Sequence, residues 1–98
     1  MQIAKVVGTL VSTKKDSKLE ALKLLLVQPA DVDGVSKGSV ICAIDSVGAG
    51  VDEIVLLAAG SSARLTDVTQ NKPVDSVIIA IIDTMEVEGQ IRYSKSAQ

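Results

Sequence analysis

The sequence predicts an all-β protein, most economically a small five-stranded Greek-key barrel of the OB type with a short helical turn. Several short segments are rich in β-branched residues, and Gly, Pro and Asp residues separate them. The chain has 98 residues, which suits a single domain over 1–98. Five or six strands in so short a chain favour a closed barrel, because closure removes exposed strand edges.

Four segments carry the clearest strand patterns. We expect strands within 3–13, 39–47, 52–59 and 76–93, where Val, Ile, Thr and Ala dominate. Gly8 falls inside the first of these segments, and a glycine within a strand often marks a bulge or a sharp bend. Such a bend is what a small barrel requires.

The segment 19–28, "LEALKLLLVQ", is ambiguous when only its own residues are considered. Leu, Ala, Glu and Lys favour a helix by propensity. Leu22, Leu24 and Leu26 alternate along the segment, however, and Pro29 ends it after ten residues. Helix and strand remain equally acceptable on these observations.

The end of the chain is expected to extend beyond the barrel. Residues from about 84 to 98 form a C-terminal extension that is partly flexible, and 94–98 is expected to be a frayed end. Glu86 and Glu88 would share one face if the strand continued through them, because side chains alternate along a strand.

Some strands are apolar on both faces, above all "VIIAII" at 77–82. In a small barrel one face of each strand points inward, so the other face needs a second cover. We therefore expect another chain to cover it, which makes the protein an oligomer.

Composition excludes several functions. The net charge of −2 gives no basic field for nucleic acid or anionic membrane, and no segment approaches the roughly 20 apolar residues of a spanning helix. We expect a soluble cytoplasmic protein. Cys42 is the single cysteine, which suits a reducing compartment, and its apolar neighbours predict a buried side chain.

No catalytic, metal or cofactor site is predicted. The chain has no His, so it lacks both the usual zinc ligands and the usual base for a serine nucleophile at Ser61 or Ser62. Gly48 and Gly50 have no third glycine in the register of a dinucleotide loop, and no P-loop is present. We expect no enzyme and no cofactor.

An OB-type module that binds a ligand or single-stranded nucleic acid is the alternative function. Such modules combine a basic groove with aromatic side chains on which bases stack. This chain has an acidic balance, and Tyr93 is its single aromatic residue. These features make nucleic-acid binding a poor fit, but the OB-type binding module is kept as the alternative function.

Five segments together resemble the EutN/CcmL family of bacterial microcompartment shell vertex proteins. They follow one another in the family's order and spacing: "VGTLVSTKK" (7–15), "LKLLLVQP" (22–29), "DSVGAG" followed by a Glu (45–53), "GSSAR" (60–64) and "PVDSVIIAIID" (73–83). The resemblance covers nearly the whole chain as far as residue 83.

The resemblance implies an OB-like barrel assembled as a homopentamer that caps the vertices of a polyhedral shell, as in carboxysomes. Its implied partners are further copies of itself and hexagonal shell proteins, with no nucleic acid and no membrane. It also implies that 19–28 contains a strand. Five subunits are inferred from the family, and the residues alone do not exclude six.

Beside the resemblance, we hypothesise that subunits meet through residues 45–64, where Gly48, Ala49 and Gly50 lack bulk and let backbones approach closely. The family usually has a glycine where this chain has Asp52, so a backbone with positive φ there would be strained. We expect Arg64 to pair with Glu53 or Asp45 across or just inside a subunit boundary, the alternative being an ion pair within one chain.

We expect Ser61 and Ser62 to cap the helical turn, and Gly60 to give a sharp exit into it. The candidate interface or axis residues are Asp45, Val47, Gly48, Ala49, Gly50, Glu53, Gly60, Ser61, Ser62, Ala63 and Arg64.

Overall fold

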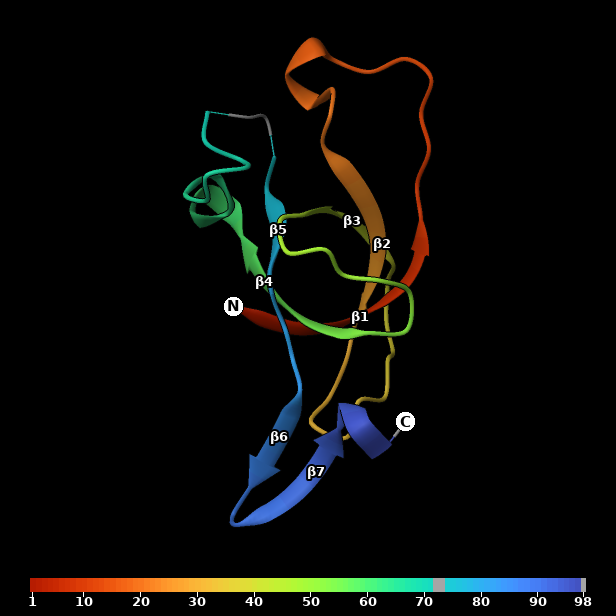
Figure 1. Cartoon of the computed structure of the whole chain (residues 1–98), viewed down its shortest axis with the longest axis vertical. Coiled ribbons are helices and arrows are strands. Elements are labelled where there is room, and N and C mark those ends of the chain that lie inside the picture. Colours follow the sequence, from red (N-terminus) through yellow and green to blue (C-terminus); the bar gives the residue numbers. More distant parts are fainter. Residues whose placement is uncertain (72–73, 98) are drawn as a thin grey trace.

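A closed five-stranded barrel forms the body of the molecule (Figure 1). The computed structural model describes residues 1–71 and 74–97. The strands close in the order β1-β2-β3-β5-β4, and β4 also pairs with β1. The predicted small barrel is thereby confirmed. Its strands are β1 (Gln2–Thr9), β2 (Lys23–Pro29), β3 (Ile41–Asp45), β4 (Ile54–Ala59) and β5 (Ser76–Ile81).

Strand pairing explains how so short a chain closes. The pairs are antiparallel except β3 with β5, which run parallel over two residue pairs. The register of β1 against β2 shifts between Val6 and Gly8, which confirms the bulge expected at this glycine. The ambiguous 19–28 segment contains the last residue of a short 3-10 helix, η1 (Ser17–Leu19), and then β2, so strand is correct for most of it.

The barrel interior is filled by alternate residues of the five strands. Side chains on successive residues of a strand point to opposite faces, so one set reaches the interior. Val6, Leu25 and Val27 are each at most 1 % exposed. The inner cluster comprises Ala4, Val6, Leu25, Val27, Ala43, Ala49, Val55, Leu57 and Ile78, with Ile81 packed against it.

A second apolar cluster covers part of the outer barrel surface. Val77 points outward and packs with Ile44 and Ala63, the latter from the 3-10 helix η2 (Gly60–Arg64). Leu22 and Leu24 pack against the same cluster. The expectation that another chain must cover the outer face of "VIIAII" is therefore too simple, because the chain covers part of that face itself.

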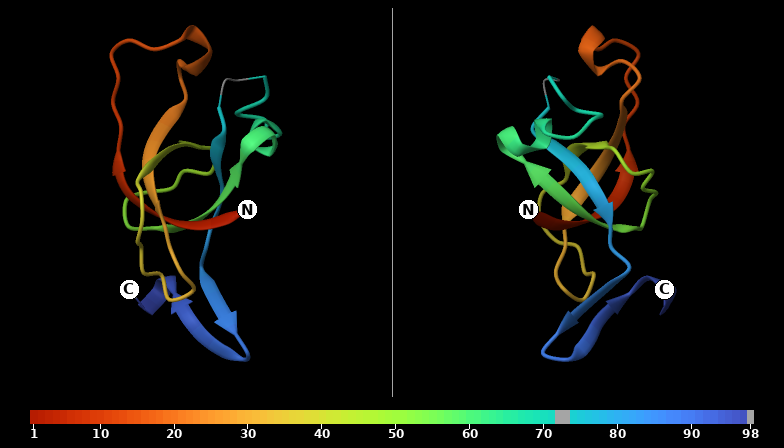
Figure 2. Two further views of the ribbon diagram at one scale, coloured as in Figure 1. Left: turned by 180° about the vertical axis from the view of Figure 1, so that it is seen from behind. Right: turned by 60° about the vertical axis from the view of Figure 1, so that its left-hand side comes forward.

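The C-terminal segment folds into a hairpin that projects from the barrel (Figures 1 and 2). Strands β6 (Thr84–Val87) and β7 (Gln90–Ser94) pair antiparallel, and a 3-10 helix, η3 (Lys95–Ala97), follows. Glu88 lies in the turn with φ 52°, so it does not continue the strand beside Glu86 as expected. The molecule measures 45 × 24 × 22 Å along its principal axes, with this hairpin at one end of the long axis and the loop that contains η1 at the other (Figure 1).

Two further expectations are wrong. The end of the chain is not frayed at Lys95, whose backbone N–H donates to the Asp83 carbonyl at 2.8 Å. Cys42 is exposed rather than buried, because strand alternation turns Ala43 into the barrel and leaves Cys42 on the outside. Partial desolvation, and secondly the Asp75 carboxylate, raise the pKa of this thiol above its ordinary 9.0.

None of the helices within 1–71 and 74–97 has both the length and the apolar character needed to cross a membrane.

Candidate functional site

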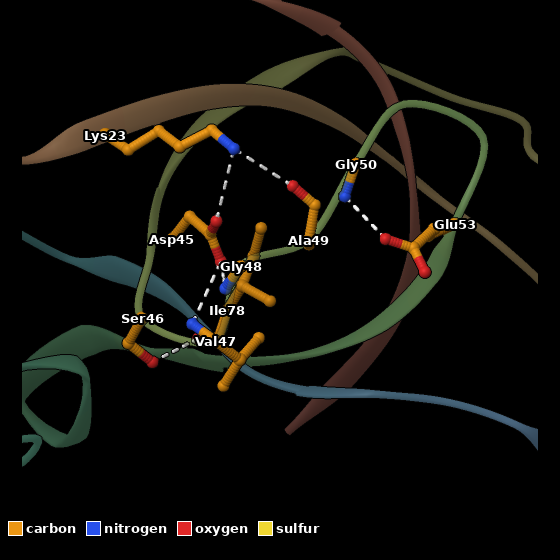
Figure 3. A network of polar contacts seen from close by, with 9 residues as sticks. All are labelled: Lys23, Asp45, Ser46, Val47, Gly48, Ala49, Gly50, Glu53 and Ile78. Carbon is orange, nitrogen blue, oxygen red and sulfur yellow. Dashed lines mark hydrogen bonds and ion pairs between the residues drawn. The ribbon is translucent and has the colours of Figure 1, made fainter.

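The loop of residues 45–53 joins β3 to β4 and contains six of the predicted interface residues. Asp45, the last residue of β3, organises its first half (Figure 3). Its side chain is 2 % exposed, and its Oδ1 accepts hydrogen bonds from the backbone N–H groups of Val47 and Gly48, both at 3.1 Å. Asp commonly bonds to backbone two residues on in this way, which favours a turn.

Lys23 holds the same carboxylate from β2, the neighbouring strand. Its Nζ lies 3.7 Å from Asp45 Oδ2 and donates to the Ala49 carbonyl at 3.2 Å. The two residues are directly opposite in the β2–β3 register, so strand pairing places them together. Lys23 is not among the residues predicted from the sequence, although it is the polar residue that interrupts the leucines of its segment.

Glu53 organises the second half of the loop. Its Oε1 accepts the Gly50 N–H at 2.6 Å, and its Oε2 forms an ion pair with Lys95. The Lys95 hydrogen bond, and then the Gly50 N–H, hold the pKa of Glu53 below its ordinary 4.5. A lowered pKa means that the carboxylate stabilises the fold above the unfolded-state pKa, and that this contribution is lost as the pH falls through the folded-state pKa.

These contacts fix which side chains of the loop face outward. Ala49 is 1 % exposed and belongs to the inner barrel cluster, so its side chain faces its own subunit. Val47 and Val51 are 40 % and 49 % exposed on either side of it. Gly48 has φ 81°, and nothing lies within 4 Å of the point that a Cβ would occupy. Within its own subunit, glycine is therefore favoured at this position by the positive φ and not by a lack of space for a side chain. The loop presents an apolar tip on a fixed backbone.

Asp52 has φ 75°, the left-handed conformation that the resemblance indicated would strain this position. Its backbone N–H donates to the Val6 carbonyl at 2.8 Å, which ties the strained residue to β1. In L-residues this conformation crowds the Cβ atom, and Asp tolerates it better than most.

We expect Asp52→Gly to raise the free energy of unfolding by about 0.5 kcal/mol, since relief of the strain exceeds the added chain entropy. Urea unfolding at fixed protein concentration measures the change. Asp52→Asn is the control, because Asn tolerates the left-handed region and lacks the charge. An equal gain in both variants would attribute the effect to charge, and a loss in Asp52→Gly would contradict the strain argument.

The 3-10 helix η2 contains the remaining predicted site residues. Gly60 enters it with φ 64°, consistent with the expected sharp turn. Ser61 and Ser62 do not cap it: the N-cap residue is Ala59, without a side-chain cap bond, and the Ser62 hydroxyl donates back to the Ala59 carbonyl at 2.7 Å. The helix begins earlier than predicted, so both serines lie inside it. Ala63 is fully buried in the outer cluster of its own chain.

Arg64 is exposed, and within residues 1–71 and 74–97 it takes part in no ion pair. The alternative of an intrachain ion pair for Arg64 has no support in this part of the chain. Its two expected partners are engaged elsewhere, Asp45 by Lys23 and Glu53 by Lys95. The structure of one chain does not bring Arg64 together with the 45–53 loop through an ion pair.

The loop and η2 offer exposed side chains rather than a metal or base-stacking site. The described residues contain no cluster of three or more His, Cys, Asp or Glu side chains that could hold a metal ion. Tyr93 is 5 % exposed, so the single aromatic ring offers no platform on which a base could stack. Rigid carboxylate-supported turns and exposed valines are suited to contact with protein.

Solved structures with this fold define the class of protein. The structure of CcmL from Nostoc sp. superposes with a TM-score of 0.92 at 51% identity, covering 97% of this chain and 100% of that one. The GrpN pentameric microcompartment shell protein from Rhodospirillum rubrum superposes with a TM-score of 0.80 at 39% identity, covering 89% and 99%. The fold is therefore that of a structural shell protein rather than an enzyme.

Sequence comparison identifies the family. The family model described as ethanolamine utilisation protein EutN/carboxysome matches residues 1–83. The carboxysome shell vertex protein CcmL of Nostoc sp. is 50% identical over 99 residues, which cover 100% of this chain and 98% of that protein. The shell vertex protein PduN of Salmonella typhimurium is 44% identical over 89 residues, covering 87% and 98%. The chain belongs to the EutN/CcmL family and is a vertex-class protein of a bacterial microcompartment shell.

Proposed function

We propose that five copies of this chain form a closed ring that caps the vertices of a polyhedral shell, with the 45–53 loop at the boundary between copies. The observation that carries this placement is the loop itself. Asp45 and Glu53 fix its backbone from within, while Val47 and Val51 face solvent in the single chain.

A loop of this kind is suited to a subunit contact. Exposed apolar side chains gain free energy when a partner covers them, and a backbone that is already fixed loses little conformational freedom on binding. A cyclic ring uses a heterologous interface, in which two different surfaces of each copy meet. The loop tip supplies one surface, and the exposed η2 end with Arg64 supplies a candidate for the other.

The outer rim of the ring would meet hexagonal shell proteins. A five-fold unit among six-fold tiles introduces curvature, so a flat layer can close into a polyhedron. We favour a carboxysome as the compartment, since identity is 50% over the whole chain with carboxysome CcmL of Nostoc sp., against 44% over 87% of the chain with PduN of Salmonella typhimurium.

Arg64 provides the test of the boundary. Its guanidinium can donate two parallel hydrogen bonds to a carboxylate or bond to carbonyls of a neighbouring copy. We expect Arg64→Ala to raise the dissociation constant of the ring roughly tenfold or more, as for a central interface arginine. Native mass spectrometry over a dilution series gives the distribution of subunit number.

Lys37→Ala is the matched control, because Lys37 is also exposed and forms no ion pair in the described part of the chain. It should leave the five-subunit mass unchanged at every dilution. If Arg64→Ala behaves like this control, Arg64 has no role in assembly. A six-subunit or single-subunit mass for the unaltered protein would refute the pentameric ring itself.

A further inference from the structure

The hairpin of β6 and β7 lies outside the residues that match the family model, which end at 83. An isolated two-stranded hairpin is marginally stable in water. This hairpin therefore needs support from the barrel, and three contacts between described residues give it.

The first contact is a two-pronged ion pair. Arg92 Nε donates to Asp33 Oδ1 and Arg92 Nη2 donates to Asp33 Oδ2, both at 2.8 Å. Asp33 lies in the turn that follows β2, where its own backbone N–H donates to Asp31 Oδ1 at 2.9 Å. Because the geometry is bidentate, the pair fixes direction as well as distance.

The second contact places an aromatic ring against backbone. Tyr93 is 5 % exposed, and a Cβ added at Gly34 would lie 2.8 Å from Tyr93 Cδ1. Gly34 belongs to the same turn as Asp33 and has φ 79°. The Tyr93 ring therefore packs directly against the backbone of the turn. Any residue other than glycine at position 34 would force the ring or the turn to move.

The third contact joins the end of the hairpin to the 45–53 loop. Lys95, directly after β7, forms the ion pair with Glu53, whose other oxygen accepts the Gly50 N–H. The backbone N–H of Lys95 donates to the Asp83 carbonyl, which holds the residue close to the base of the hairpin.

We propose that the C-terminal hairpin is a clasp, and that Lys95 is a positioning residue that holds Glu53, and through it the Gly50 turn of the 45–53 loop. The loop then has two anchors of the same kind. Lys23 from the barrel supports Asp45 at its start, and Lys95 from the hairpin supports Glu53 at its end.

This arrangement makes the conformation of the loop depend on a segment outside the residues that the family model matches. The consequence for assembly rests on the proposed placement of the loop between subunits. The clasp itself is a property of one chain, and can be measured separately.

Hydrogen exchange at the Gly50 amide is the direct measurement. Lys95→Met removes the charge and keeps the apolar stem, and should speed local opening at Gly50 roughly two- to fivefold, the effect of one partly exposed ion pair. Lys18→Met is the matched control, because Lys18 is exposed and in no ion pair within the described residues. Exchange at Gly50 should not change in that control.

A pH profile and a rescue variant separate positioning from general loss of stability. In the unaltered protein, opening at Gly50, corrected for intrinsic exchange, should increase as the pH falls through the lowered pKa of Glu53. In Lys95→Met the increase should move to higher pH, toward the ordinary value of 4.5. Lys95→Arg keeps the cation and should restore both the slow exchange and the profile.

Unchanged Gly50 exchange in Lys95→Met, or failure of Lys95→Arg to restore it, overturns the clasp. Native mass on dilution is recorded for the same variants. Faster exchange together with weaker rings supports both the clasp and the subunit boundary. Faster exchange with rings as stable as the unaltered protein's supports the clasp and overturns the placement of the loop between subunits.

Discussion

Asp45→Ala is expected to lower the free energy of unfolding by about 2–3 kcal/mol, because the change removes the acceptor of two backbone hydrogen bonds and one member of an ion pair. The Val47 and Gly48 N–H groups lose their bonds to Oδ1, and Lys23 Nζ loses its ion-pair partner while it keeps its bond to the Ala49 carbonyl. Both amides lie on the exposed part of the loop and can bond to water, which limits the loss. The apolar tip should lose its fixed shape, so the ring should also dissociate at higher concentration.

Asp45→Asn isolates the hydrogen bonds from the charge. Its amide oxygen can still accept from both backbone N–H groups, whereas attraction to Lys23 is lost. We expect a cost of about 1 kcal/mol or less, since Lys23 is 58% exposed and solvent screens the pair. Chemical unfolding at one fixed subunit concentration compares the variants, because unfolding of an oligomer depends on concentration. Equal costs for Ala and Asn would show that the charge, not the turn, carries the effect.

The barrel could be predicted from the sequence because its determinants are local and repetitive. Alternation along each strand, breakers between strands and the bulge at Gly8 each have a direct signal in neighbouring residues. The strain at position 52 was predictable too, since the resemblance indicated a glycine site and the backbone does have positive φ there. The choice between helix and strand for 19–28 depends on tertiary context, because the residues favour a helix by propensity while barrel closure requires the strand β2.

The clasp could not be predicted, because its contacts join residues far apart in the sequence. Asp33 and Arg92 are separated by 59 positions, and neither carries a local signature. Charged residues near a chain end are usually solvated, so the expectation of a frayed end at Lys95 follows ordinary statistics. Nothing in the sequence indicates that Glu53 pairs with the distant Lys95 either, because only the folded hairpin brings the two side chains together.

Errors at Ser61, Ser62 and Cys42 have a more local cause. The residue at which a short 3-10 helix begins decides which side chain caps it, and a shift of one or two residues places both serines inside η2. Cys42 is expected to be buried because its neighbours in the sequence are apolar. Side chains of β3 alternate between the two faces of the strand, however, and Cys42 faces outward.

Gly34→Ala is expected to cost about 3 kcal/mol of stability, the largest single effect of one added methyl group that we expect in the described part of this chain. Two effects contribute: about 1 kcal/mol from positive φ in a residue with a Cβ, and about 2 kcal/mol from overpacking against Tyr93. The second effect arises because the nearest ring atom lies 2.8 Å from the added carbon. Tyr93 must move, and the bidentate contact of Arg92 with Asp33 lies beside it.

Gly89→Ala is the control for the first effect alone. Gly89 has φ 81°, close to the 79° of Gly34, and nothing lies within 4 Å of an added Cβ. It should therefore cost about 1 kcal/mol, and the difference of about 2 kcal/mol between the two variants measures the close seat of Tyr93. The cost of Gly34→Ala should be smaller when it is measured in a Tyr93→Ala background than in the unaltered protein, because the smaller side chain removes the clash.

The site of the damage distinguishes this prediction from general unfolding. The inner barrel cluster contains no residue of β6 or β7 among the described residues, so the barrel should keep its far-ultraviolet spectrum at room temperature while the hairpin loosens. Limited proteolysis should then cut Gly34→Ala within 84–94 and leave Gly89→Ala less affected. Since the loosened hairpin carries Lys95, the Gly50 amide should also exchange faster in Gly34→Ala. Equal stability of the two glycine variants would mean that the Tyr93 ring can move away at no loss of stability. The hairpin would then not be fixed against the turn at Gly34, and it could not hold the 45–53 loop in position.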